Sequence, residues 1–288
     1  MKFGRFAQQG HTFFGIVESD EVTELDDSPW GSYQVTRDRH QVSALKFMVP
    51  CIPQNFYCAG VNYAAHVEWA KRKGLGVKMP DKADVGYRSP NALIANGDPI
   101  VIPVDSVGPV QFEGELVAVI GKKARNLTEA DALSCVLGLT LGNDLSERNW
   151  QSQDRTLWRA KNCDSFKPMG PFIVTGLDPM KLTISIKVNG RIVSKYDTGN
   201  MLFSLQHYIF QITRYMTLYP GDVIWLGTDG ATEPDLKEGD VVEICNDEIG
   251  VLSNPVVRAS AAPASGLRSA RAPADEALPG HGRSNLRS

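Results

Sequence analysis

The segment Val110-Gln-Phe-Glu-Gly-Glu-Leu-Val-Ala-Val-Ile120 carries two acids, Glu113 and Glu115, in an otherwise apolar run. Its apolar and β-branched residues predict a strand. Side chains two positions apart on a strand point to the same face of the sheet. Two like charges this close repel each other and are costly to bury unless a cation neutralises them. The segment therefore predicts a site for a hard divalent metal ion.

A third acid, Asp144, lies in Leu139-Thr-Leu-Gly-Asn-Asp-Leu-Ser-Glu-Arg148, after an apolar run and where a strand is expected to end in a turn. Together with Glu113 and Glu115 it would provide three carboxylates. All-oxygen ligation suits Mg²⁺, Mn²⁺ or Ca²⁺ better than Zn²⁺, which usually takes histidine or cysteine. The spacing alone also fits two exposed strand acids and a capping aspartate, so both interpretations stay open at this point.

The composition is that of an ordinary globular protein, with 288 residues, 42% of them hydrophobic and 22% charged. A net charge of −3 gives no reason to expect a nucleic-acid partner or binding to an anionic membrane surface. The sequence contains no run of about 18 apolar residues, so no transmembrane helix is expected. The first residues also lack the apolar core of a signal peptide. The five cysteines are scattered without a Cys-x-x-Cys pair, which favours a reduced, cytoplasmic location without disulfides or zinc.

Changes in composition divide the chain into three parts. Residues 1–53 are expected to form a small β domain, because the apolar segments 3–6 and 12–17 flank a turn. Residues 54–258 form the body and contain mostly short apolar strands between Gly, Pro, Asn and Asp turns. Residues 259–288 are rich in Ala, Ser, Pro, Gly and Arg and are expected to be a disordered tail.

Local signals predict individual elements within the body. The run 183–188 is expected to be a strand that Asn189-Gly190 turns into a hairpin. A helix is expected at 128–137, where Thr128 would cap the first turn. A second helix is expected within 201–218, where apolar residues recur at helical spacing before Pro220-Gly221.

The order and spacing of several motifs make the chain resemble the fumarylacetoacetate hydrolase family over about residues 54–257. The motifs are Gly60-Val-Asn-Tyr63 with His66, Glu113-Gly-Glu115, Asn143-Asp144-x-Ser146-x-Arg148-x-x-Gln151, Lys161-x-x-Asp164-x-Phe166, Pro168-x-Gly170-Pro171, Asn189-Gly190, Pro220-Gly-Asp-Val-Ile224, Gly227-Thr228, 240–244 and Ile249-Gly-x-Leu-x-Asn-Pro255.

The resemblance implies an α+β fold that is predominantly β, a mixed β roll with flanking helices and a small N-terminal β domain. It implies that Glu113, Glu115 and Asp144 bind Mg²⁺ or Mn²⁺. The metal would chelate the 2-oxo carboxylate end of a small-molecule substrate and hold an enolate as it forms. Relatives form homodimers, so a homodimer is expected.

The resemblance also implies roles for side chains around the metal. Lys161 would supply positive charge near the substrate carboxylate or the developing oxyanion. Gln151 and Thr228 would face the substrate, and Tyr87 resembles part of a substrate-lining segment. His66 is the expected general base that activates water.

The sequence departs from the family pattern beside His66. Many members have His-x-x-Glu, which places both side chains on one face of a helical turn. In this chain Glu68 follows His66 at a spacing of two, about 200° apart on a helix. Glu68 can therefore orient His66 only where the segment is extended or irregular.

The implied activity is hydrolysis of a C–C bond in an acylpyruvate-like β-diketo acid by a Mg²⁺- or Mn²⁺-dependent enzyme. The alternatives use the same enolate without the dyad. They are isomerisation of a 2-hydroxy-diene dioate, decarboxylation of a 2-oxo acid, and hydration or dehydration of a 2-oxo-enoate. A catalytically silent family member is the remaining alternative, which the three acids disfavour, because unpaired carboxylates would destabilise the core.

Overall fold

The computed structural model describes residues 1–72, 74, 78–229 and 232–260. The expected disordered tail therefore lies outside the described residues, apart from its first two positions. Strands dominate the described residues and helices are few, as the sequence predicted. None of the helices among them has the length and apolar character needed to cross a bilayer.

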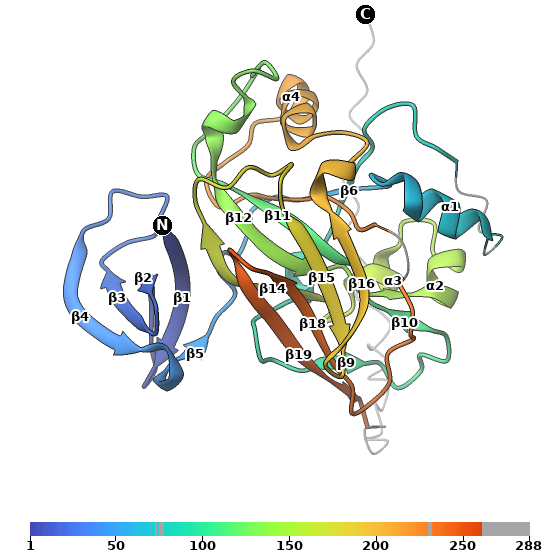
Figure 1. The fold of residues 1–288 in the computed structure, drawn as a ribbon, viewed down its shortest axis with the longest axis horizontal. Helices are drawn as coiled ribbons and strands as arrows, with labels where there is room; N and C mark the ends of the chain where they lie inside the picture. The colour runs from blue at the N-terminus through green and yellow to red at the C-terminus, as the bar shows by residue number, and fades with distance from the viewer. Residues whose placement is uncertain (73, 75–77, 230–231, 261–288) are drawn as a thin grey trace, which may run out of the picture.

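The largest sheet runs across most of the molecule (Figure 1). Its order is β4 (Val35–Gln41), β3 (Glu21–Leu25), β2 (His11–Glu18), β1 (Lys2–Gln8), β14 (Lys167–Val174), β12 (Val136–Asn143), β11 (Gly114–Ile120), β17 (Val223–Trp225), β6 (Phe56–Ala59) and β7 (Val85–Tyr87). Two short strands join it, with β5 (Lys46–Phe47) paired to β1 and β8 (Leu93–Ile94) paired to β14.

Smaller sheets and short helices complete the body. The second large sheet has the order β16 (Arg191–Asp197), β15 (Thr183–Val188), β18 (Val241–Asn246), β19 (Gly250–Arg258) and β9 (Ile100–Ile102). A two-stranded ladder joins β10 (Val110–Gln111) to β13 (Ser146–Glu147). The α-helices are α1 (Ala64–Arg72), α2 (Arg148–Gln153), α3 (Trp158–Asn162) and α4 (Leu205–Tyr215). Short 3₁₀ turns span Val42–Ala44, Pro90–Ala92, Ala132–Cys135 and Thr198–Asn200.

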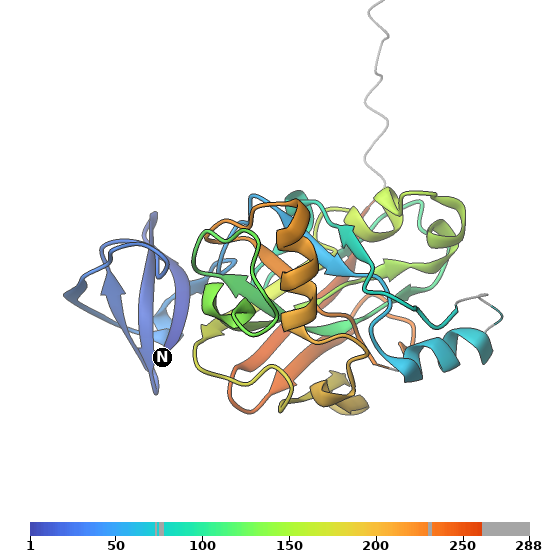
Figure 2. The same cartoon turned by 90° about the horizontal axis from the view of Figure 1, so that it is seen from above.

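The N-terminal strands extend the main sheet, because β1 pairs antiparallel with β14 from Lys2 opposite Val174. They lie at one end of the molecule and α1 lies at the other (Figures 1 and 2). Their small core, which contains Phe6 and Phe13, continues onto Phe172 of β14. The N-terminal strands and the body are thus joined by backbone pairing as well as by apolar contact.

β11 is buried on both faces, which explains its nearly continuous apolar sequence. One face contributes Leu116 and Ala118 to the core shared with the second large sheet, and the other contributes Val117 and Val119 to a separate cluster. Gly114 allows the two sheets to approach closely at the start of this strand. A Cβ atom there would lie 2.8 Å from the Cδ1 atoms of Ile186 and Ile244.

The local predictions had different outcomes. The hairpin at Asn189-Gly190 is confirmed, with both residues at positive φ between β15 and β16. The helix within 201–218 is confirmed as α4, whose cap Ser204 accepts a hydrogen bond from the His207 amide.

The prediction of a helix at 128–137 is wrong. Thr128 Oγ1 does accept the Asp131 amide, as a cap would, but only a 3₁₀ turn follows, and from Val136 the chain forms β12. Pairing of β12 with both β11 and β14 outweighs the local capping signal, which is worth only about 1 kcal/mol.

Replacing Gly114 by Ala is predicted to lower the free energy of unfolding by about 1–3 kcal/mol, because the new methyl group overpacks the space between the sheets. Chemical denaturation would measure the loss. Combining Gly114→Ala with Ile186→Val, which removes one of the two crowding Cδ1 atoms, should recover part of it. Strictly additive effects in this double-mutant cycle would contradict the proposed contact.

Candidate metal centre and substrate cavity

Glu113, Glu115 and Asp144 converge at the paired ends of β11 and β12. The strands pair Gly114 with Asn143, so Glu113 lies just before β11 and Asp144 just after β12. The Asp144 amide donates to the Glu113 carbonyl at 2.8 Å, and the Asn143 side chain accepts from the Glu113 amide. All three acids are buried, and a set of one oxygen from each lies within 4.8 Å.

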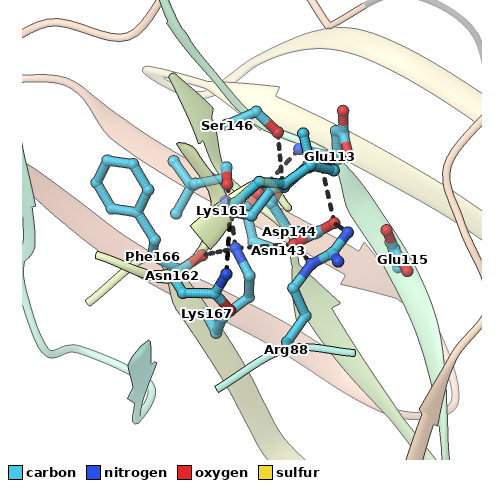
Figure 3. Close-up of polar contacts among 12 residues, drawn as sticks. Arg88, Glu113, Glu115, Asn143, Asp144, Ser146, Lys161, Asn162, Phe166 and Lys167 are labelled. Carbon is cyan, nitrogen blue, oxygen red and sulfur yellow. Dashed lines mark hydrogen bonds and ion pairs between the residues drawn. The ribbon is translucent and has the colours of Figure 1, made fainter. Parts of the chain in front are cut away.

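Four cationic side chains surround these acids (Figure 3 shows three of them). Arg148 Nη2 lies 2.8 Å from Glu113 Oε1. Lys161 Nζ lies 2.5 Å from Glu113 Oε2 and 2.8 Å from Asp144 Oδ2. Arg88 and Lys167 contact Asp144 as well. Lys161 was predicted to face the substrate, and in this structure its side-chain partners are the acids themselves.

Glu115 is the exception among the three acids. Its described contact is the Gly227 amide, 2.8 Å from Oε2, and no described cation forms an ion pair with it. Burial raises the pKa of Glu115 to about 8, helped by the neighbouring charges of Asp144 and Glu113. Burial also opposes ionisation of Glu113, but Lys161 and Arg148 outweigh it and lower that pKa to about 2.

The donor set fits a hard divalent ion. It consists of carboxylate oxygens only, which is the chemistry that Mg²⁺ and Mn²⁺ prefer. Glu115 adds a separate argument, because a buried carboxylate without a described cation partner is stabilised in its charged form by a metal. Among the described residues, the three acids form the one cluster of this kind.

A cavity of about 430 Å³ lies next to Arg148, which contacts Glu113, and the three acids are not among its lining residues. His66 and Trp69 from α1 line it, together with Arg148 and Gln151 from α2. Arg148 links the cavity to the acids, because Nη1 donates to Gln151 Oε1 at 2.7 Å while Nη2 contacts Glu113. Two residues predicted as functional, His66 and Gln151, thus line the same cavity.

The structure does not bring Glu68 to His66. Residues 64–72 are helical, so the condition for an orienting contact is not met. Glu68 is exposed, and its carboxylate accepts from Lys71 Nζ at 2.7 Å. The His66 ring instead stacks on Trp69, with ring centroids 5.3 Å apart.

Thr228 and Tyr87 occupy different surroundings. Thr228 is buried and directly follows Gly227, whose amide binds Glu115. Tyr87 is 58% exposed, and its hydroxyl donates to Met216 Sδ at 3.1 Å. It does not line the cavity of His66 and Gln151. Its neighbour Arg88 points to the acids instead.

Sequence reasoning assigned no role to Arg88, Arg148 or Lys167. Arg148 stood in the Asn-Asp-x-Ser-x-Arg motif, and Arg88 directly follows the predicted Tyr87. Lys167 follows Lys161 by six residues and is entirely buried. Burial lowers the pKa of this lysine to about 8, although Asp144 favours its charged form. In the sequence, each of these cations is only a charged residue in or near a motif. Such a position does not tell a buried cation from a surface one.

Comparison with known proteins identifies two matching family models. The model described as fumarylacetoacetate hydrolase, C-terminal, matches residues 55–257. The model described as Rv2993c-like, N-terminal, matches residues 1–50.

Relatives and solved structures cover most of the chain. Mitochondrial oxaloacetate tautomerase Fahd2a of Rattus norvegicus is 34% identical over 264 residues, 88% of this chain and 79% of its own length. A structure described as 5-carboxymethyl-2-hydroxymuconate delta-isomerase from Mycobacterium smegmatis has a TM-score of 0.81 and 33% identity, covering 90% of this chain and 100% of its own. One described as 2-hydroxyhepta-2,4-diene-1,7-dioate isomerase from Mycobacterium marinum has a TM-score of 0.79 and 31% identity, covering 90% and 98%.

Binding of Mn²⁺ at pH 7 is predicted to release protons, because a carboxyl with a pKa of about 8 is mostly protonated there. The affinity should therefore rise as the pH is raised from 6 to 8. Isothermal titration calorimetry in two buffers of different ionisation enthalpy measures the released protons. Glu115→Gln should abolish the release and weaken binding, whereas the exposed Glu238→Gln should change neither. Metal binding by the unsubstituted protein without proton release would contradict the assignment of Glu115.

Proposed function

Because the chain belongs to the fumarylacetoacetate hydrolase family, we propose that it is a metal-dependent enzyme that moves a proton on a 2-oxo acid, as a keto–enol tautomerase or diene isomerase. Relatives at 31–34% identity carry the names of an oxaloacetate tautomerase and of two isomerases. Those names describe the relatives and supply the reaction class that is proposed for this chain.

Glu113, Glu115 and Asp144 are the proposed metal ligands. When bound there, Mg²⁺ or Mn²⁺ would supply Lewis-acid stabilisation of negative charge on the 2-oxo oxygen of the substrate. The mutual approach of the three carboxylates supports this assignment, as does the burial of Glu115 without a described cation partner.

The chain's own cations would then hold the substrate. Arg148 lies between the cavity and Glu113, so its guanidinium is placed to attract a substrate carboxylate. Gln151, which Arg148 contacts, would fix the orientation of that carboxylate. Lys161 would place positive charge beside the oxygen that becomes negative as C3 loses its proton.

His66 is the proposed proton carrier. In this scheme it carries the proton between C3 of the substrate and the enol oxygen, in either direction, so no bond between heavy atoms breaks. Its place in the cavity that Arg148 and Gln151 also line supports this role. Thr228, which directly follows Gly227 and its contact with Glu115, is a proposed substrate neighbour.

The position of Glu68 is the observation that favours proton transfer over hydrolysis. Activation of water by His66 through a neighbouring carboxylate would need Glu68 beside the ring. Glu68 is exposed and paired with Lys71, and it comes from the same helix as His66. Proton transfer on an enolate requires no such pair.

Hydrolysis of the C–C bond in an acylpyruvate-like acid is the second candidate. The observation in its favour is that His66 lines a cavity of about 430 Å³, which has room for water beside a small acid. Water would add to the distal carbonyl and the carbon–carbon bond would break, with pyruvate leaving as its enolate. The two candidates therefore differ in their products.

With Mn²⁺ bound, the protein is predicted to accelerate loss of the enol absorbance of oxaloacetate without forming carbon dioxide. Lys161→Met should reduce this rate by about 100-fold or more, because the developing oxyanion loses its charged neighbour. Lys181→Met, at an exposed lysine, is the matched control and should have the full rate. Glu68→Gln should also keep the full rate.

A panel of acylpyruvates distinguishes the two candidates. Release of pyruvate from an acylpyruvate, together with no effect on oxaloacetate enol, would contradict proton transfer and support hydrolysis. Carbon dioxide from oxaloacetate would indicate decarboxylation instead.

A further inference from the structure

Cations occupy both carboxylate oxygens of Asp144 (Figure 3). Oδ1 lies 3.0 Å from Arg88 Nε and 2.7 Å from Lys167 Nζ. Oδ2 lies 2.8 Å from Arg88 Nη2 and 2.8 Å from Lys161 Nζ. A carboxylate accepts about four hydrogen bonds, so this acid is saturated by protein groups. A metal ion can bind to it only by displacing one of them.

Lys161 is the partner that can be displaced from Oδ2. Its ammonium is held by side-chain oxygens of Glu113 and Asp144, with the Asp144 carbonyl more distant at 3.4 Å. A divalent ion that takes the two carboxylate oxygens would thus replace most of its partners. The ammonium would then be free to face a substrate.

Lys167 cannot leave Oδ1 in the same way. Its side chain has 0% exposure, and it is the first residue of β14. Nζ donates to the carbonyls of Phe166 at 2.8 Å and Leu145 at 3.0 Å, in addition to its contact with Asp144. These backbone carbonyls fix the charge in place whether or not a metal is bound.

Arg88 already orients Asp144 through two parallel hydrogen bonds. A further partner adds little to the orientation of the carboxylate. Lys167 therefore mainly places a fixed positive charge beside the acids and occupies Oδ1 of Asp144. Partners that merely orient a ligand normally strengthen metal binding, whereas a fixed cation beside the site repels the metal.

We propose that Lys167 weakens divalent-metal binding at this centre, by holding Asp144 Oδ1 and by repelling the ion, so that Asp144 offers only Oδ2. The inference rests on the proposed metal-dependent function and adds a determinant of metal affinity to it. The metal in this protein is then exchangeable, rather than a permanently bound part of the fold.

Titration of free Mn²⁺ by electron paramagnetic resonance at pH 7 tests this without any measurement of activity. Lys167→Met removes the charge at similar size, and Lys167→Gln removes it while keeping a donor for the Leu145 and Phe166 carbonyls. Both variants should bind Mn²⁺ at least about tenfold more tightly than the unsubstituted protein. Lys181→Met removes an exposed lysine and should leave the affinity unchanged. Thermal unfolding would identify the variants that are folded.

Equal or weaker Mn²⁺ binding by a folded Lys167 variant would overturn the inference. If Glu115→Gln still weakened binding in that case, the proposed metal centre would stand without this role for Lys167. Failure of the unsubstituted protein and of both variants to bind Mn²⁺ would overturn the metal centre and the inference together. Tight binding by a Lys167 variant where the unsubstituted protein binds weakly would support both.

Discussion

The balance of charge around three buried carboxylates is the constraint on which this structure depends. Pairing of β11 with β12 fixes Glu113, Glu115 and Asp144 close together inside the protein. Such a cluster is tolerable only with cations beside it, because burial of unpaired charge is costly. The chain supplies them from four separate places: Arg88 after β7, Arg148 on α2, Lys161 on α3 and Lys167 on β14. The arrangement of the body therefore serves to bring these segments to one point.

The acids themselves could be predicted from the sequence, because their signal is local. Two acids in an apolar strand and a third after the next apolar run already indicated a cluster. The cations could not be found in this way. Arg88 contacts Asp144 across 56 positions of sequence, and nothing near it distinguishes a buried guanidinium from an exposed one. The sequence argument assigned neutralisation of the acids to a metal alone, whereas protein cations neutralise two of the three.

In the fold, too, local signals could be read from the sequence, whereas pairing between distant segments could not. The hairpin at Asn189-Gly190 and the helix α4 followed from local turn and periodicity signals. The sequence of residues 128–137 begins with a helix-capping signal, but β12 begins at Val136. Because β12 pairs with both β11 and β14, this long-range pairing outweighs the local signal. The α1 segment shows how a single spacing changes the partner of a side chain. Because Glu68 follows His66 by two positions on a helix, it reaches Lys71 and solvent instead of the cavity. In the proposed function, the cavity residues from α1 and α2 determine the reaction type, and the acids held by β11 and β12 determine the metal chemistry.

The central claim is that Glu113, Glu115 and Asp144 together hold one divalent metal ion. Anomalous diffraction at the manganese absorption edge, from crystals grown with Mn²⁺, tests it most directly. The account predicts a single strong peak at about 2.0–2.4 Å from an oxygen of each of the three carboxylates. It also predicts that Lys161 Nζ has moved away from Asp144 Oδ2, while Lys167 Nζ remains at Oδ1. A fully occupied Mn²⁺ site elsewhere in the protein, with the three acids still in contact only with their protein cations, would contradict this assignment.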